Sequence, residues 1–188
     1  MSTKRLFVSL ELPHSVGHGL SELDPHLRGV RWLAPEQMHL TLSFLGNVPD
    51  DVAEKLKKNL CAIEWKAFFL PLVGFGTFPG KGRPNVIWIG VGTGHPHLFQ
   101  LHKRVQEGAL AAGLEPDLRS FHPHITVARC RDVSPESIRP FLKTHAGFDA
   151  GMIHIESFCL NSSEPTSTGS VYTNELVCSS QATHTFSD

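Results

Sequence analysis

The sequence has no excess of charge of either sign. Its 188 residues include 17 basic and 18 acidic side chains, which gives a formal net charge of −1. Without a net field, the chain as a whole is not drawn to nucleic acid or to an anionic membrane. A site for a polyanion therefore has to be local.

Cysteine and long apolar runs are also scarce. The four cysteines lie far apart and form no Cys-x-x-Cys pair, so we interpret them as reduced structural residues of a cytoplasmic protein. No apolar run approaches the roughly 18 residues that a membrane-spanning helix needs. The apolar stretch at residues 6–12 is short, alternates with polar side chains and contains Glu11, which is atypical of a signal peptide. We therefore expect no membrane association.

Apolar periodicity predicts both strands and helices. Segments typical of strands cover residues 6–12, 39–46, 67–75, 85–91, 122–129, 152–160 and 171–178. Helical patterns cover residues 13–28, 49–63 and 95–112, and a further helix begins with Ser134 as its N-cap. The polar stretch 161–170 is typical of a loop.

The strands alternate apolar and polar side chains, which favours a mainly antiparallel sheet in an α+β fold over a parallel, doubly wound one. No change in composition and no long linker divides the chain. We therefore predict a single domain over residues 1–188, which is long enough to bury a sizeable core.

One four-residue pattern occurs twice. His39-Leu40-Thr41-Leu42 and His124-Ile125-Thr126-Val127 both read His-apolar-Thr-apolar, and a predicted helix follows each copy. Residues two apart in a strand point to the same face, roughly 6.5–7 Å apart. The repeat therefore predicts an internal duplication, with two similar halves that each present a histidine and a threonine on the face opposite the apolar side chains.

These histidines also allow interpretations other than a catalytic one. A single copy of the pattern would be more typical of a solvated or hydrogen-bonded histidine, because the chain has twelve histidines. His122 and His124 lie two residues apart in the predicted strand 122–129 and therefore on the same face, which suggests a metal site. Zinc needs three or four protein ligands in most sites, and no cysteine or second histidine pair lies at a suitable spacing. The duplicated pattern favours the catalytic interpretation, and we expect no metal.

Two imidazoles on either side of one phosphorus atom suit phosphoryl transfer. One histidine takes a proton from the attacking oxygen and the other gives a proton to the leaving oxygen. Histidine suits both tasks because its unperturbed pKa of about 6.5 lets both protonation states exist near neutral pH. Threonine hydroxyls can donate hydrogen bonds to the remaining phosphate oxygens.

The paired motifs and their flanks resemble the 2H phosphoesterase superfamily. Within it the sequence is similar to the bacterial and archaeal RNA 2′,3′-cyclic phosphodiesterases, formerly called 2′-5′ RNA ligases. The resemblance is carried by RLFVSLELP, HLTLSFLGNV, VIWIGV and SFHPHITVARCRD, and by the region near the C-terminus that contains NSS and VYT. It implies two pseudo-symmetric lobes of antiparallel sheet and helices around a central groove, with one motif on each lobe. It also implies metal-free, cofactor-free opening of cyclic phosphate ends on RNA or small nucleotides to 2′-phosphates, in some members with reversible 2′-5′ ligation.

The resemblance assigns roles to six residues. His39 and His124 become the general acid and base, and Thr41 and Thr126 hold the phosphate. We assign His39 as the proton donor to the leaving O3′ and His124 as the proton acceptor for water, although nothing in the sequence favours this order over the reverse. Arg129 matches an arginine near the phosphate, although strict alternation places it on the face opposite His124, so this role requires a bulge or a strand end. The remaining match is the C-terminal aromatic Tyr172, beside the groove.

Two questions stay open on the sequence alone. Phe44 occupies the family's phenylalanine position after the first motif, but its alternation with Leu42 predicts a core residue. The substrate is the other question: the alternatives are another cyclic or 2′-5′ linked nucleotide, or a non-catalytic module that binds RNA ends. We expect a monomer.

Overall fold

A computed structural model of the chain describes residues 2–92, 95–115, 117, 119–167 and 169–181. The helices are α1 (His14–Ser21), η1 (Pro35–Gln37, a 3-10 turn), α2 (Asp50–Cys61), α3 (Pro96–Ala111) and α4 (Pro135–Thr144). The strands are β1 (Thr3–Glu11), β2 (Val30–Trp32), β3 (His39–Pro49), β4 (Phe68–Phe78), β5 (Val86–Gly90), β6 (His124–Cys130), β7 (Asp149–Ile155), β8 (Ser157–Thr166) and β9 (Gly169–Ser179).

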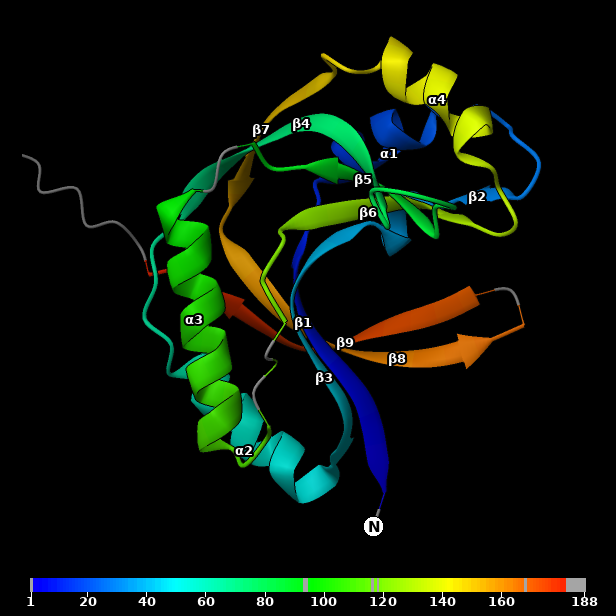
Figure 1. Cartoon of the computed structure of the whole chain (residues 1–188). Coiled ribbons are helices and arrows are strands. Elements are labelled where there is room, and N and C mark those ends of the chain that lie inside the picture. Colours follow the sequence, from blue (N-terminus) through cyan, green and yellow to red (C-terminus); the bar gives the residue numbers. More distant parts are fainter. Residues whose placement is uncertain (1, 93–94, 116, 118, 168, 182–188) are drawn as a thin grey trace, which may run out of the picture.

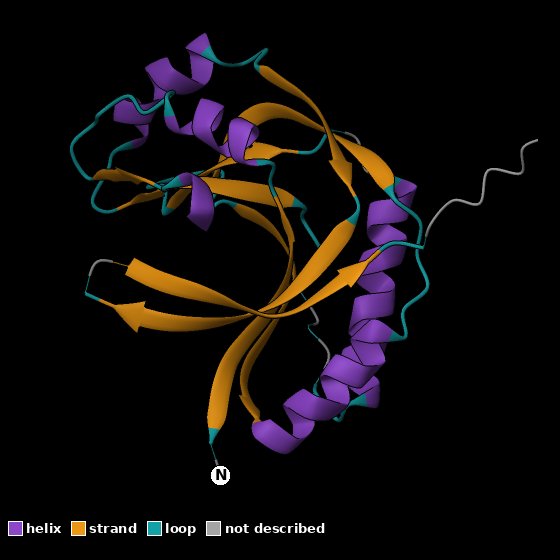
Figure 2. Cartoon of the chain, turned by 180° about the vertical axis from the view of Figure 1, so that it is seen from behind, coloured by secondary structure: helices purple, strands orange, loops and turns teal. Residues whose placement is uncertain are grey.

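All described strands belong to one sheet, with the order β7-β4-β5-β6-β3-β1-β8-β9 and with β2 added beside β6. The pairs between these strands are antiparallel. Figures 1 and 2 show that the sheet bends strongly and carries its helices in two groups, α1 with α4 and α2 with α3. The prediction of an α+β fold with a mainly antiparallel sheet is therefore confirmed.

The sheet divides into two lobes between β6 and β3, where the register consists of the single pair Leu40–Ile125. Lobe A contains β3, β1, β8 and β9 with α2 and α3, and lobe B contains β7, β4, β5, β6 and β2 with α1 and α4. Each motif strand is followed by a helix of its own lobe, β3 by α2 and β6 by α4. The halves of the chain interleave, however, because α1 packs in lobe B and α3 in lobe A.

The helices begin and pack as their sequences predict. Pro49 is the N-cap of α2, and the two aspartates of its first turn lie at the positive end of the helix dipole, which favours carboxylates. Its buried residues Leu56 and Leu60 belong to the hydrophobic core together with Leu101 of α3. Ser134 caps α4, because its Oγ accepts a hydrogen bond from the Ser137 backbone N–H.

Several boundaries differ from the sequence prediction. The helix expected over 13–28 ends at Ser21, ahead of the helix-breaking Pro25. The strand expected over 152–160 is two strands separated at Glu156, because β7 pairs with β4 of lobe B and β8 pairs with β9 of lobe A. The loop expected over 161–170 is mostly the β8–β9 hairpin, whose polar composition reflects exposure around its tip. The short strand β2 was not predicted.

All four cysteines are unpaired thiols, as predicted. Among the described residues, no helix is both long enough and apolar enough to cross a membrane.

Candidate active site

The two motif strands meet at the junction between the lobes. Leu40 and Ile125 are cross-strand partners and are buried, so the residues on either side of each point to the opposite face. Continuing the antiparallel register places His39 beside Thr126 and Thr41 beside His124. The histidines are then diagonal neighbours, and diagonal positions lie about 7–8 Å apart. The charge of His124 also acts on His39, as expected at this proximity.

The two imidazoles are oriented in the same way. Nδ1 of His39 lies 3.0 Å from the carbonyl oxygen of Gln37, and Nδ1 of His124 lies 2.6 Å from the carbonyl oxygen of His122. A carbonyl only accepts, so Nδ1 carries the hydrogen in both rings. This bond fixes the tautomer and leaves Nε2 as the nitrogen that a ligand can use. In each motif the carbonyl comes from the residue two positions before the histidine.

The surroundings of the two rings differ. His39 is stacked on Phe7, with ring centroids 4.9 Å apart, and meets the edge of Tyr172 at 5.2 Å. Its burial lowers its pKa to about 4, and the nearby Arg129 charge acts in the same direction. The His124 ring lies 4.9 Å from Phe78, and burial lowers its pKa as well.

A β-bulge lies at the fourth residue of each motif. Opposite β1, Leu42 is an extra residue in β3, and opposite β5, Val127 is an extra residue in β6. Because of the bulge, two consecutive residues are buried, and the sixth residue counted from the histidine is exposed. Both strands therefore share one burial pattern from the histidine onward. That sixth residue is Phe44 in lobe A and Arg129 in lobe B.

The bulges bear on two expectations from the sequence, one for Phe44 and one for Arg129. Phe44 is 57 % exposed, so the prediction of a core residue is wrong. Arg129 has the bulge that its expected position beside the phosphate requires, and its charge acts on His39. Phe44 and Arg129 occupy equivalent positions when the two copies are aligned from their histidines. An exposed position for one therefore predicts an exposed position for the other.

Cavities continue from both histidines. Beside His39 lies a cavity of about 530 Å³, whose walls include Tyr172, Glu11 and the buried Asn161. Beside His124 lies one of about 430 Å³ that Phe78 and Trp88 line, and a smaller one that Thr41, Phe44 and Arg119 line. The expected place of Tyr172 near the groove agrees with its contact to His39.

Several of these groove residues were missed from the sequence. Ser9 and Glu11 on β1 are the register partners of Thr41 and His39, and Asn161 donates a hydrogen bond of 2.8 Å to Ser9 Oγ. The guanidinium of Arg119 lies 5.9 Å from the centre of the Phe44 ring. Polar residues at alternating positions of 6–12 were a signal for β1, and the NSS segment of the resemblance includes Asn161. Nothing in the sequence linked Arg119 to the motifs.

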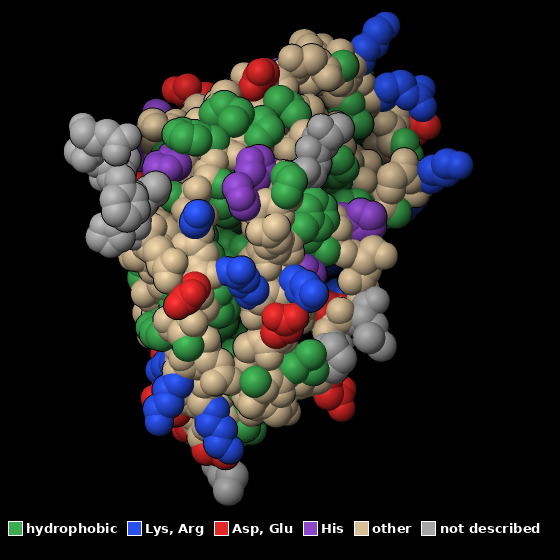
Figure 3. All heavy atoms as spheres, turned by 90° about the vertical axis from the view of Figure 1, so that its left-hand side faces the viewer, with side chains coloured by type: hydrophobic (Ala, Val, Ile, Leu, Met, Phe, Trp, Pro, Cys, Tyr) green, Lys and Arg blue, Asp and Glu red, His purple; other side chains and the backbone are tan. Residues whose placement is uncertain are grey.

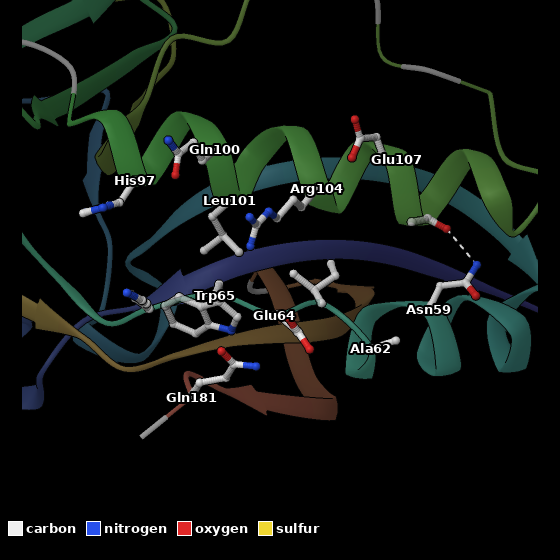
Figure 4. A pocket seen from close by; sticks show the side chains of 13 residues that line it. Asn59, Ala62, Glu64, Trp65, His97, Gln100, Leu101, Arg104, Glu107 and Gln181 are labelled. Atoms are coloured by element: carbon white, nitrogen blue, oxygen red, sulfur yellow. Dashed lines mark hydrogen bonds between the residues drawn. The ribbon is translucent and has the colours of Figure 1, made fainter. Parts of the chain in front are cut away.

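A cavity larger than those beside the histidines lies elsewhere. It has a volume of about 690 Å³ and is formed by α3, the end of α2 and the segment after it (Figure 4). Leu101 and Arg104 point into it from α3, with Trp65 on the opposite side. Basic and acidic side chains lie next to one another on the α2–α3 face in Figure 3, so no single sign of charge dominates there. None of the six predicted site residues lines this cavity.

The register sets a histidine and a threonine from each lobe side by side at the junction, an arrangement that suits acid–base catalysis on a phosphate ester. A family model described as "LigT like Phosphoesterase" matches the chain twice, over residues 10–88 and 89–172. The protein therefore belongs to the LigT-like phosphoesterases, a 2H phosphoesterase family, and the predictions of this family and of an enzyme are confirmed.

Relatives of known name agree with this assignment. An RNA 2′,3′-cyclic phosphodiesterase of Aquifex aeolicus is 33 % identical over 155 residues, which cover 81 % of this chain and 82 % of the relative. One of Aeropyrum pernix is 32 % identical over 138 residues, or 73 % and 78 % of the two chains.

Solved structures share the fold. E. coli LigT in complex with 3′-AMP superimposes with a TM-score of 0.77 at 26 % identity, covering 96 % of this chain and all of that one. A Thermus thermophilus protein, TT0787, superimposes with a TM-score of 0.78 at 28 % identity and the same coverage. Each of the two matches of the family model contains one of the two His-x-Thr motifs.

Proposed function

We propose that the protein hydrolyses 2′,3′-cyclic phosphate ends of RNA or of small nucleotides to 2′-phosphomonoesters. The observation that carries the proposal is the Leu40–Ile125 pair, whose register brings the two His-x-Thr motifs together at the junction of the lobes. The names of the Aquifex aeolicus and Aeropyrum pernix relatives support the choice of substrate. We treat residues 1–188 as one two-lobed catalytic domain, with one motif in each lobe.

The proposed reaction needs only side chains of this chain. His124 accepts a proton from water as its oxygen attacks phosphorus, and His39 donates a proton to O3′ as the P–O3′ bond breaks. The hydroxyls of Thr41 and Thr126 donate hydrogen bonds to the non-bridging oxygens. Arg129 balances the charge that gathers on them. Each acid or base contributes about 10²- to 10⁴-fold to the rate.

The donor role of His39 depends on the substrate. In the free protein the pKa of His39 is about 4, so its ring is neutral at pH 7. A bound phosphate brings a negative charge next to the ring, which favours the protonated form and raises this pKa. The rate should therefore be bell-shaped in pH, with limbs that belong to the coupled histidine pair rather than to either ring alone.

The cavities support a second candidate reaction. Space continues beyond both histidines, about 530 Å³ beside His39 and about 430 Å³ beside His124. A nucleoside on each side of the phosphorus would make a 2′-5′ linked nucleotide a substrate, and the reverse reaction would be a 2′-5′ ligation. The third alternative is a non-catalytic module that binds RNA ends. His39→Ala separates it from the enzyme, because RNA binding would survive in both cases and a hydrolytic activity would be lost only if the protein catalyses the reaction.

Product mapping tests the proposal. An oligonucleotide with a 2′,3′-cyclic phosphate end is incubated with the protein in excess EDTA, and the products are separated. We expect a 2′-phosphomonoester, formed at the same rate with and without the chelator. A 3′-phosphomonoester would overturn the assigned leaving group, and complete loss of activity on chelation would overturn the metal-free mechanism. The cytoplasmic location and the monomeric state stay predictions from the sequence.

A further inference from the structure

The β8–β9 hairpin extends from lobe A, and its tip contacts the chain just before the first motif. Gln37 Nε2 donates a hydrogen bond of 3.1 Å to the carbonyl oxygen of Ser170. The neighbouring Gly169 is close as well: a Cβ at this position would lie 3.5 Å from Gln37 Nε2 and 3.2 Å from Arg31 Nη1. The hairpin tip is therefore held against the segment that leads into β3.

Gln37 also holds His39 directly. Its carbonyl oxygen accepts the Nδ1 hydrogen bond of His39 at 3.0 Å, while its side chain reaches the hairpin. Two residues beyond Ser170, Tyr172 meets the His39 ring at 5.2 Å and Phe7 at 5.1 Å. One residue thus contacts both the catalytic ring and the hairpin that covers it.

We propose that Gln37 is a positioning residue, which keeps the β8–β9 hairpin closed over His39 and over the adjacent cavity. The inference rests on the proposed function, because Gln37 acts here through a catalytic His39. Tyr172, Thr173 and Asn174 of the hairpin line this cavity. Releasing the Gln37–Ser170 bond loosens that wall and lets water reach the His39 ring.

The expected effect on His39 is one of burial and not of charge. Burial is the largest cause of its lowered pKa. The titratable and charged groups that surround it on the packed elements and the cavity wall are Glu11, His14, Glu36, His124, Arg129 and Tyr172. Of these only Tyr172 belongs to the hairpin. Opening the hairpin therefore removes an aromatic cover and leaves the neighbouring charges in place.

Lobe B offers an internal contrast. His122 supplies the equivalent carbonyl to His124, but its side chain is exposed and makes no hydrogen bond to the described part of the chain. A link between the carbonyl-donating residue and a covering hairpin is therefore a feature of lobe A.

Gln37→Met tests the link, because methionine has nearly the same length and cannot donate a hydrogen bond. The pKa of His39 is measured by NMR titration of the free protein, and kcat and KM are measured with 2′,3′-cyclic AMP. We expect the pKa of His39 to rise toward its ordinary value and KM to rise about two- to tenfold, the worth of one hydrogen bond. At pH 7 kcat should change less than KM.

Two further variants complete the test. Gln37→Lys restores a donor that can reach the Ser170 carbonyl, and it should bring both the pKa and KM back toward the parent values. Gln100→Met, on the exposed side of α3 and away from the groove, should leave both unchanged.

An unchanged pKa of His39 in Gln37→Met would overturn the inference, even if KM rose, since the hairpin would then act on the substrate alone. Failure of the lysine variant to restore either quantity would also overturn it. The NMR titration needs no substrate. A wild-type protein that lacks hydrolytic activity would therefore refute the proposed function, while the pKa comparison would still test whether Gln37 controls His39.

Discussion

Lobe A and lobe B share the same backbone arrangement around their motifs but surround the two histidines with different side chains. In both, a histidine and a threonine lie opposite the buried side chains of the motif, and Nδ1 of the histidine is hydrogen-bonded to the backbone carbonyl two residues earlier. A bulge also exposes the sixth residue counted from the histidine. Lobe A covers its histidine with Phe7 and Tyr172 and exposes Phe44. Lobe B exposes Arg129. The backbone geometry is thus duplicated, whereas burial and charge have diverged.

From this difference we expect distinct tasks at equivalent positions. The aromatic face of Phe44 can stack on a nucleobase, while the guanidinium of Arg129 can bind phosphate oxygens. The two lobes also place their histidines in different electrostatic settings, because His39 has both deeper burial and the nearby charge of Arg129. A symmetric backbone therefore presents two different side chains, an aromatic ring and a guanidinium, at equivalent positions.

Removing either histidine should have the largest effect. We expect His39→Ala and His124→Ala each to lower kcat by about 10²- to 10⁴-fold on 2′,3′-cyclic AMP, because one proton transfer in the transition state is lost. Steady-state kinetics measures this, with His97→Ala on the exposed start of α3 as the matched control. If one histidine variant kept the parent kcat, the two lobes would not share the reaction as proposed.

Stability in acid should separate the two histidines next. A histidine whose folded pKa lies below its unfolded value is protonated first in the unfolded state, so acidification favours unfolding. For His39, with a folded pKa of about 4 against about 6.5 when unfolded, the free energy of unfolding should fall by up to about 3 kcal/mol between pH 6.5 and 4. Above pH 6.5 its contribution is constant.

Urea unfolding at pH 7 and pH 4.5 checks this expectation. His39→Gln should remove more of the difference in unfolding free energy between the two pH values than His124→Gln does. Equal effects of the two substitutions would contradict the deeper burial of the lobe A histidine.

The sequence predicted the framework of the site better than its periphery. The His-x-Thr pattern identified the two strands because a two-residue period is a property of any strand and needs no knowledge of packing. It failed at Phe44, since the bulge that reverses the alternation depends on how β3 pairs with β1. For Arg129 the need for a bulge could be stated in advance, because its family position conflicted with the alternation.

Sequence patterns did not predict the contacts between segments that are distant in the chain. Glu11 and Ser9 lie beside the first motif because β1 and β3 are neighbours. The polar ends of β8 and β9 form strands because these two strands pair with each other. The break at Glu156 is of the same kind, since the chain there leaves one lobe for the other. Pairing partners, and not local composition, decided each of these features.

The exposed sixth residues should give the smallest effects and the sharpest contrast. Arg129→Met should lower kcat/KM about tenfold or more for every cyclic phosphate, because a charged hydrogen bond to the phosphate is lost. Phe44→Ala should lower it about tenfold for 2′,3′-cyclic AMP through lost stacking, and leave ribose 2′,3′-cyclic phosphate, which has no base, unaffected. Phe44→Tyr keeps the ring and should behave as the parent. Equal sensitivity of both substrates to Phe44→Ala would mean that this ring supports the motif strand and does not bind the base, and the division of tasks between the lobes would then rest on Arg129 alone.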